Sequence, residues 1–395
     1  MKQPARLVVL LAIVSSFGCP GAQPFSINPY IYDCLDFEAL TTGQTFTGGN
    51  VISGGGVSLS VATAGWVNPR HARVDNRRYA RGTGLDLNLN NVSLDIAFTR
   101  APDAVAFQFG DLGGQLQLNV NGNAQTLNDL HSLNGQTIAG VEIAVTAFQQ
   151  GANWYGFIVF AGPLSQLTVG GQELWIDNMC GVRLADHIAL VDLRSHTSAG
   201  PTPHYLVAPL LEVLHDYDIA TYEHTTGNLS AGLLSAVDAV IFLPKRGKLT
   251  EPEKDLVRNY IDDGGGVLVF GDYVGAPTTT LDVYQDLFDV VGAVHENQNI
   301  GIFLGSQNFT NHPITQGVTS SNMVAATTVS GTGYTTVVHT HTTNPANRPL
   351  IIAKDQGSGR AVVTGDATFV YNGYIDQYNN AQVFLGMVEW LLKRR

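Results

Sequence analysis

The sequence predicts two domains: an all-β jelly-roll sandwich, followed by an α/β domain with a mostly parallel, flavodoxin-like sheet. Residues 25–183 hold no lysine, and short runs such as Val57–Val61 alternate apolar and polar residues between Gly- and Asn-rich turns. From residue 187 the apolar runs become continuous and alternate with helical patterns, as in parallel sheets covered on both faces. The chain of 395 residues has only 14% charged residues and 43 glycines, which is typical of a folded, β-rich protein.

The elements of each block follow from local patterns. In the first block Leu85–Leu89 and Leu116–Val120 also alternate, and Asn121–Gly122 and Asn134–Gly135 are tight-turn signals. In the second block a capping box, Thr250–Glu253, opens a helix. The expected elements of this block are strands at 187–193, 238–244, 267–270 and 360–364, helices at 205–215, 250–261 and 381–392, and an inserted β segment or long loops over 295–350.

The start of the chain looks like an export signal. Lys2 and Arg6 precede the apolar run Leu7–Val14 and then small residues, which predicts a signal peptide over 1–18. Eight apolar residues are too few for a membrane span, which needs about 20. The four residues ending at Cys19 also look like a bacterial lipobox, with a Phe where a small residue is usual, so a lipid on Cys19 is an alternative to simple cleavage. We therefore expect a protein that is extracellular, periplasmic or lipid-anchored at the cell surface.

The net charge and the cysteine count indicate which partners and which redox compartment to expect. A net charge of −12 disfavours nucleic acid and anionic lipid surfaces as partners, so membrane contact is expected only through a lipid on Cys19. Export leaves Cys34 and Cys180 as an even pair in an oxidising compartment, which predicts a disulfide. Two separate buried thiols are the alternative.

Several motifs follow one another in the second block, residues 187–395. They are the helix start at Thr250, the stretches 262–269, 312–318 and 365–369, and the ending with 379–380 and 390–391. Together they resemble the class I glutamine-amidotransferase-like superfamily in its divergent, non-amidotransferase branches. Amidotransferases of the superfamily hold a nucleophilic Cys in a sharp Gly-x-Cys-x-Gly turn, where its pKa falls. Here that turn corresponds to Gly271–Gly275 with Tyr273 at the nucleophile position, and no Cys follows Cys180. The resemblance thus implies the fold without glutamine hydrolysis.

A crevice at the carboxyl ends of the strands is the expected ligand position in such a sheet. The polar residues expected there are Asp192, Arg194, His196, Lys245, Asp272, Tyr273 and Asp366. Carboxylates with a His suit a divalent ion or acid–base chemistry. The alternative is that Asp272 and Asp366 only cap the helices that follow them.

The first block opens with Cys34–Glu38 and closes with the stretch Gly170–Cys180. These two ends resemble secreted bacterial jelly-roll modules of the galactose-binding or carbohydrate-binding kind. Such modules often hold a structural Ca²⁺ between the first and last strands, which implies a ligand role for Glu38 and Asp177, with Asp36 and Asn178 as further candidates. The alternative is that Asp177 and Asn178 simply cap a turn.

One basic cluster stands out in this acidic chain. It comprises Arg70, Arg73, Arg77, Arg78 and Arg81, interleaved with Trp66, His71 and Tyr79. Arginine with aromatic residues suits an anionic sugar or a phosphate, and Trp66, Trp154 and Tyr155 are candidates for a sugar platform. A solvated loop paired with Asp75 and Asp86, with the Trp residues in the core, is the alternative.

These observations favour a secreted or lipid-anchored, non-catalytic binding protein. Its Ca²⁺-stabilised jelly roll is expected to bind a glycan, and its inactive amidotransferase-like domain a ligand or a cell-surface protein. The competing hypothesis is an extracellular hydrolase of carbohydrate or ester that uses Asp272, Asp366 and His196. A purely structural surface component is the third.

Overall fold

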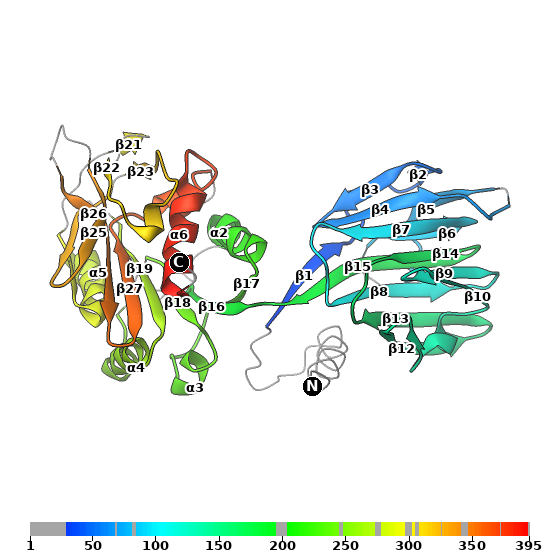
Figure 1. Cartoon of the computed structure of the whole chain (residues 1–395), viewed down its shortest axis with the longest axis horizontal. Helices are drawn as coiled ribbons and strands as arrows, with labels where there is room; N and C mark the ends of the chain where they lie inside the picture. The colour runs from blue at the N-terminus through cyan, green and yellow to red at the C-terminus, as the bar shows by residue number, and fades with distance from the viewer. Residues whose placement is uncertain are drawn as a thin grey trace. The chain divides into compact units, whose positions relative to one another are not determined.

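The computed structural model describes residues 29–67, 69–80, 84–194, 204–244, 248–272, 278–296, 302–304, 308–324, 326–340, 347–371 and 373–393. The chain divides into two compact units, Tyr30–Leu184 and Ala185–Arg395 (Figure 1). Strands outnumber helices in the described residues. No helix among them is long and apolar enough to cross a membrane.

The N-terminal unit consists of two antiparallel sheets (Figure 1). The larger has nine strands in the order β11-β12-β13-β8-β15-β6-β5-β2, with β1 also paired to β15. Its strands are β1 (Tyr30–Leu35), β2 (Thr45–Phe46), β5 (His71–Asp75), β6 (Asp86–Asn90), β8 (Ala104–Asp111), β11 (Thr137–Ile138), β12 (Val141–Gln150), β13 (Asn153–Ala161) and β15 (Leu174–Leu184). The smaller has six strands in the order β10-β9-β14-β7-β4-β3. Its strands are β3 (Val51–Gly54), β4 (Val57–Ala62), β7 (Val92–Phe98), β9 (Leu116–Val120), β10 (Asn123–Leu127) and β14 (Leu167–Gly171).

One hydrophobic core lies between these two sheets. Leu59 and Leu94 of the smaller sheet belong to the same buried cluster as Phe107, Phe109 and Leu87 of the larger one. Because side chains alternate between the two faces of a strand, the residues next to these in sequence on β6 and β8 point away from this core. The outer face of the larger sheet is the face on which the candidate site lies.

The predicted disulfide is confirmed. Strand β1 pairs antiparallel with β15 so that Cys34 lies directly opposite Cys180, and the two are bonded. The bond joins the first strand of the unit to its last one across 146 residues of sequence. It fixes the segments that follow Cys34 and precede Cys180 beside each other.

The C-terminal unit is built on an eight-stranded mixed sheet in the order β17-β16-β18-β19-β27-β26-β25-β22. The parallel strands are β16 (His187–Asp192), β17 (Ile219–His224), β18 (Ala239–Phe242), β19 (Gly266–Phe270) and β27 (Gly359–Thr364). Strands β22 (Asn308–Phe309), β25 (Thr335–His339) and β26 (Pro349–Gln356) extend the sheet in antiparallel fashion. Two small hairpin-like sheets pair β20 (Ala293–His295) with β24 (Val329–Gly331), and β21 (Ile302–Leu304) with β23 (Asn322–Val324). The β-rich segment expected over 295–350 therefore supplies the antiparallel edge.

Helices cover both faces of this sheet (Figure 1). They are α2 (His204–Asp216), α3 (Ala231–Leu234), α4 (Glu251–Asp262), α5 (Thr278–Val291) and α6 (Asn380–Leu391), with short 3₁₀ turns η1 (His131–Leu133) in the first unit and η2 (Pro313–Thr315) and η3 (Thr368–Val370) in the second. Val191 on β16 packs in one core with α2 and α6, whereas its neighbour Leu190 packs in another with α4 and α5. The capping box predicted at Thr250 is present at the start of α4.

Candidate binding site

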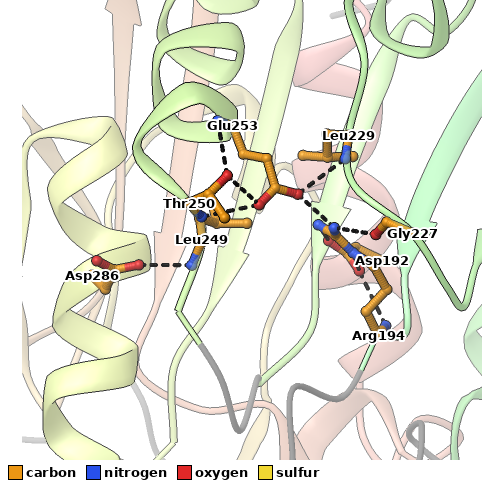
Figure 2. A network of polar contacts seen from close by, with 8 residues as sticks. All are labelled: Asp192, Arg194, Gly227, Leu229, Leu249, Thr250, Glu253 and Asp286. Atoms are coloured by element: carbon orange, nitrogen blue, oxygen red, sulfur yellow. Dashed lines mark hydrogen bonds and ion pairs between the residues drawn. The ribbon is translucent and has the colours of Figure 1, made fainter.

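A buried polar network occupies the carboxyl end of β16 in the second unit (Figure 2). The Arg194 guanidinium meets the Asp192 carboxylate side-on, with Nε 3.0 Å from Oδ1 and Nη2 2.8 Å from Oδ2. Both side chains are buried. Arg194 Nη1 also lies 2.6 Å from Glu253 Oε1 and donates to the Gly227 carbonyl at 2.8 Å. These two predicted crevice residues therefore bind each other.

Glu253 ties this network to the start of α4. Its Oε1 accepts the Leu229 N–H at 3.0 Å, and its Oε2 accepts the Thr250 N–H at 2.9 Å (Figure 2). Burial by itself would raise the pKa of Glu253, but the hydrogen bonds from Arg194, Thr250 and Leu229 outweigh it and lower the pKa to about 2. A network with one cation between two carboxylates, and with backbone groups as further partners, holds loops in place and does not present a free charge to a ligand.

Two other predicted crevice residues, Asp366 and Asp272, make contacts elsewhere. Asp366 is buried, and its Oδ1 accepts the N–H of Thr368, the first residue of η3, at 2.7 Å, although the N-cap of η3 is Ala367 and not Asp366. The Asp272 carbonyl lies 3.0 Å from His295 Nε2, a buried ring that sequence reasoning missed. Burial lowers the pKa of His295, against the hydrogen bond that its ring makes to the Asp272 carbonyl oxygen. The remaining candidates His196, Lys245 and Tyr273, like Arg81 and Cys19, lie outside the described residues.

Buried carboxylates meet on the outer face of the larger sheet in the first unit. Ile176 of β15 lies opposite Leu87 of β6, and both belong to the core. The residues beside them, Asp177 and Asp86, therefore share the opposite face. Both are 0% exposed, so a covering segment must exclude water from this part of the face.

Ionising Asp177 and Asp86 at the same time is unfavourable in the folded protein. Burial first, and then the neighbouring charges of Asp86, Glu38 and Asp36, raise the pKa of Asp177 to about 7, although the hydrogen bond from the Asn178 N–H lowers it. Burial likewise raises the pKa of Asp86 to about 6. Asp86, Glu38 and Asp36 thus lie close enough to Asp177 for their charges to raise its pKa. Asp86, which the sequence had suggested only as a partner for arginine, joins the residues predicted for calcium.

The hydrogen bonds of this acidic cluster leave one oxygen unsatisfied. Glu38 Oε1 accepts the Leu85 N–H at 2.8 Å, and Asp177 Oδ1 accepts the Asn178 N–H at 2.7 Å. Asp86 Oδ2 accepts the Ala80 N–H at 2.9 Å, whereas the buried Oδ1 has no hydrogen-bond partner among the described residues. A buried carboxylate oxygen without a partner is costly unless a proton or a cation reaches it.

The donor set fits a hard cation, although it is not assembled into a finished shell. In the part of the chain that the structure describes, no three carboxylate, imidazole or thiolate groups converge as a metal site. Ca²⁺ takes six to eight oxygens and accepts carbonyl, amide and water oxygens beside carboxylates. Carboxylates with one unsatisfied oxygen match that preference better than they match Zn²⁺, which prefers nitrogen and sulfur.

An open pocket lies beside this cluster. Its volume is about 700 Å³, within the range of small-ligand sites. One wall comes from the segment after β5 and the other from the tip of the β12–β13 hairpin. The lining residues are Arg77, Arg78, Tyr79, Gln150, Gly151, Asn153 and Tyr155.

The segment that carries Arg77, Arg78 and Tyr79 is fixed against the sheet at its far end. Ala80 N–H donates to Asp86, and the Tyr79 ring meets Trp175 edge-on with centroids 4.9 Å apart. Gly110 on β8 permits this close approach, because a Cβ there would lie 2.2 Å from the Tyr79 carbonyl oxygen. The same few residues therefore cover the acidic cluster and present the pocket.

Only part of the predicted basic cluster lines the pocket. Arg77 is exposed and its Nε lies 3.5 Å from Asp75 Oδ2, and Arg78 is exposed as well. Arg70 and Arg73 are exposed but do not line it. Trp66 is 7% exposed and its indole N–H donates to Ser93 at 2.9 Å, so its placement favours packing over an open sugar platform.

No protein-family model matches this chain, and no curated protein does. Solved structures match about half of it. The mmIFT52 N-terminal domain is 16% identical with a TM-score of 0.44, covering 52% of this chain and 96% of that one. A ThuA-like protein from Bacteroides uniformis is 14% identical with a TM-score of 0.38, covering 52% and 91%. A β-galactosidase from Rahnella sp. R3 is 15% identical with a TM-score of 0.36, covering 53% and 32%.

Proposed function

We propose that this chain is an exported, non-catalytic binding protein whose N-terminal jelly roll is stabilised by Ca²⁺ and binds a glycan. The observation that carries the proposal is the open pocket of arginine, tyrosine and amide side chains. Aromatic rings pack against the apolar faces of sugars, and amide groups both donate to and accept from sugar hydroxyls. A concave site with few convergent polar groups is the usual form of a ligand site.

The Ca²⁺ part of the proposal rests on the acidic cluster. Asp86 Oδ1, Asp177 and Glu38 are the groups that would hold the ion, with the Asn178 amide as a further oxygen donor. When bound, the ion supplies positive charge that offsets the repulsion among these carboxylates. Asp86 also accepts the Ala80 N–H, so neutralising the cluster would steady the segment that forms one wall of the pocket.

The C-terminal unit is proposed as an inactive amidotransferase-like domain that binds a ligand or a cell-surface protein. The chain has no Cys after Cys180, so it lacks a thiolate nucleophile in this unit. The Asp192–Arg194–Glu253 network supports a structural role for the polar residues after β16. The export signal predicted over 1–18 supports a location outside the cytoplasm.

Two measurements on the purified full chain test the proposal. Ca²⁺ at about 100 times its Kd should stabilise the first unit by about 2.7 kcal/mol. Asp86→Asn should abolish this gain, whereas the exposed Asp95→Asn should keep it.

A glycan array followed by calorimetry should find a saccharide whose affinity falls several-fold in Asn153→Ala. The affinity should not fall in Asn123→Ala, which changes an exposed residue outside the pocket. The absence of any bound glycan together with no effect of Ca²⁺ or EDTA on unfolding would refute the proposal.

A further inference from the structure

The pocket combines two kinds of wall. The segment after β5 contributes the guanidinium groups of Arg77 and Arg78, and the hairpin tip contributes the amides of Gln150 and Asn153. In a chain with a net charge of −12, two adjacent arginines at one pocket are a local exception. A positive wall facing a neutral, hydrogen-bonding wall selects a ligand that has a charged end and a hydroxylated body.

The arginines are available to a ligand. The Arg77 side chain is 63% exposed, and its pairing with Asp75 at 3.5 Å is too long and too solvated to hold it firmly. Arg78 is exposed and forms no ion pair with any described residue. The guanidinium fork matches the two oxygens of a carboxylate in a bidentate contact, which a lysine at these positions could not make.

The aromatic part of the pocket distinguishes a sugar acid from a simple anion. Tyr155 packs against Phe148 with ring centroids 5.7 Å apart, and its hydroxyl lies 3.3 Å from Asn153 Nδ2. Tyr79 is held edge-on by Trp175. The Tyr155 ring is 6% exposed and packs against Phe148, so only the half-buried Tyr79 ring is offered to the C–H face of a pyranose. The Asn153 amide suits the hydroxyls of the sugar.

We propose that this pocket binds an acidic saccharide of the hexuronate class, with its carboxylate on Arg77 and Arg78 and its hydroxyls toward Asn153 and Gln150. This inference rests on the proposed function and narrows its ligand. The negative charge of the neighbouring acidic cluster sets a limit on the pose, because the ligand carboxylate must lie on the arginine side of the segment and away from Asp86.

The test uses matched ligands on the full chain. Calorimetry compares a trigalacturonate with its neutral methyl ester, in EDTA and again with Ca²⁺, because uronates themselves bind calcium. A sulfated trisaccharide and inorganic phosphate provide the other sources of an oxyanion. We expect the acid to bind at least 10-fold more tightly than the ester, and this ratio to shrink as NaCl is raised.

Variants assign the contacts. Arg78→Gln should reduce the affinity for the acid about 10- to 100-fold and leave that for the ester unchanged, whereas Arg73→Gln, an exposed arginine outside the pocket, should change neither. Asn153→Ala should weaken acid and ester alike. Circular dichroism and the unfolding midpoint show whether each variant is folded.

Each other outcome is decisive. Equal binding of acid and ester overturns the acidic-ligand inference and leaves the glycan proposal standing. Binding of the sulfated sugar or of phosphate without the uronate overturns it in favour of a different oxyanion. If no saccharide binds at all, the inference and the proposed function fall together.

Discussion

Replacing Asp177 with Asn tests two effects of this carboxylate on the free energy of unfolding. Without Ca²⁺ its buried negative charge lowers stability, and with Ca²⁺ it raises stability as a ligand of the ion. Asp177 is fully buried and lies beside Asp86 and Glu38, with no cation in the acidic cluster of described residues. The amide has nearly the same shape as the carboxylate but carries no charge. In the absence of Ca²⁺ we therefore expect the variant to be more stable than the wild type at neutral pH.

The sign and the size follow from proton linkage. The pKa of Asp177 is about 7 in the fold against an ordinary value of 3.8, so the folded state binds more protons between these values. The stability contributed by the protonated group is complete below about pH 4 and is lost as the pH rises to about 7. Each pH unit in this window costs about 1.4 kcal/mol, so the advantage of Asp177→Asn over the wild type should grow by about 3 kcal/mol from pH 5 to pH 8.

Urea unfolding followed by tryptophan fluorescence measures this difference. Three of the four tryptophans, Trp66, Trp154 and Trp175, lie in the N-terminal unit and report on it. Asp95→Asn, at an exposed site on β7, serves as the control and should show no such growth with pH. Added Ca²⁺ should reverse the order, because only the wild type keeps the ligand. A variant that is less stable than the wild type at pH 8 in EDTA, or a difference that does not change with pH, would show that the charge at Asp177 is not what burial makes costly.

Three further predictions concern the supports of the two units. Gly110→Ala should lower the stability of the first unit by about 1–3 kcal/mol and abolish glycan binding, because its Cβ would collide with the Tyr79 carbonyl; unchanged calorimetric affinity would contradict the close packing of this segment. Glu253→Gln should destabilise the second unit by about 3–5 kcal/mol through the loss of a charge partner for Arg194, measured by chemical unfolding with the exposed Glu251→Gln as the control. Reduction of the disulfide should cost about 4–5 kcal/mol in the loop-entropy model, and an unfolding midpoint that is the same with and without reductant would argue against it.

Local patterns predicted the elements of this protein well, and for a physical reason. The alternation in Val57–Val61 reports which face of a strand is buried, and the Thr250–Glu253 spacing reports how a helix satisfies its first N–H groups. The pairing of Cys34 with Cys180 followed from counting an even pair. Each of these signals is carried by residues that are close in sequence or few in number.

Which residues meet in each site depends on the register between strands that are distant in sequence. Asp86 and Asp177 become neighbours only because β6 pairs with β15 at Leu87 and Ile176, 89 residues apart in sequence. The hairpin tip around Asn153 joins the segment of Arg77 in the same way, through the order of strands in the sheet. A single sequence contains no record of that register, so Asp86 was expected beside arginine, and Gln150 and Asn153 were not singled out.

The two polar clusters of this protein differ in their balance of positive and negative side chains. In the C-terminal unit Arg194 stands between Asp192 and Glu253, and neighbouring backbone groups supply further hydrogen bonds to the network, so it can persist without any further partner. In the acidic cluster of the N-terminal unit the buried groups Asp86 and Asp177 are both acidic, and Asp86, whose neighbour Arg78 is exposed, keeps an unsatisfied oxygen. Because folding does not bury net negative charge without something to neutralise it, the second cluster must take up a proton or a cation. Asp192 and Arg194 thus neutralise each other within the described network, and we propose the acidic cluster beside the arginine pocket as the place where a ligand binds.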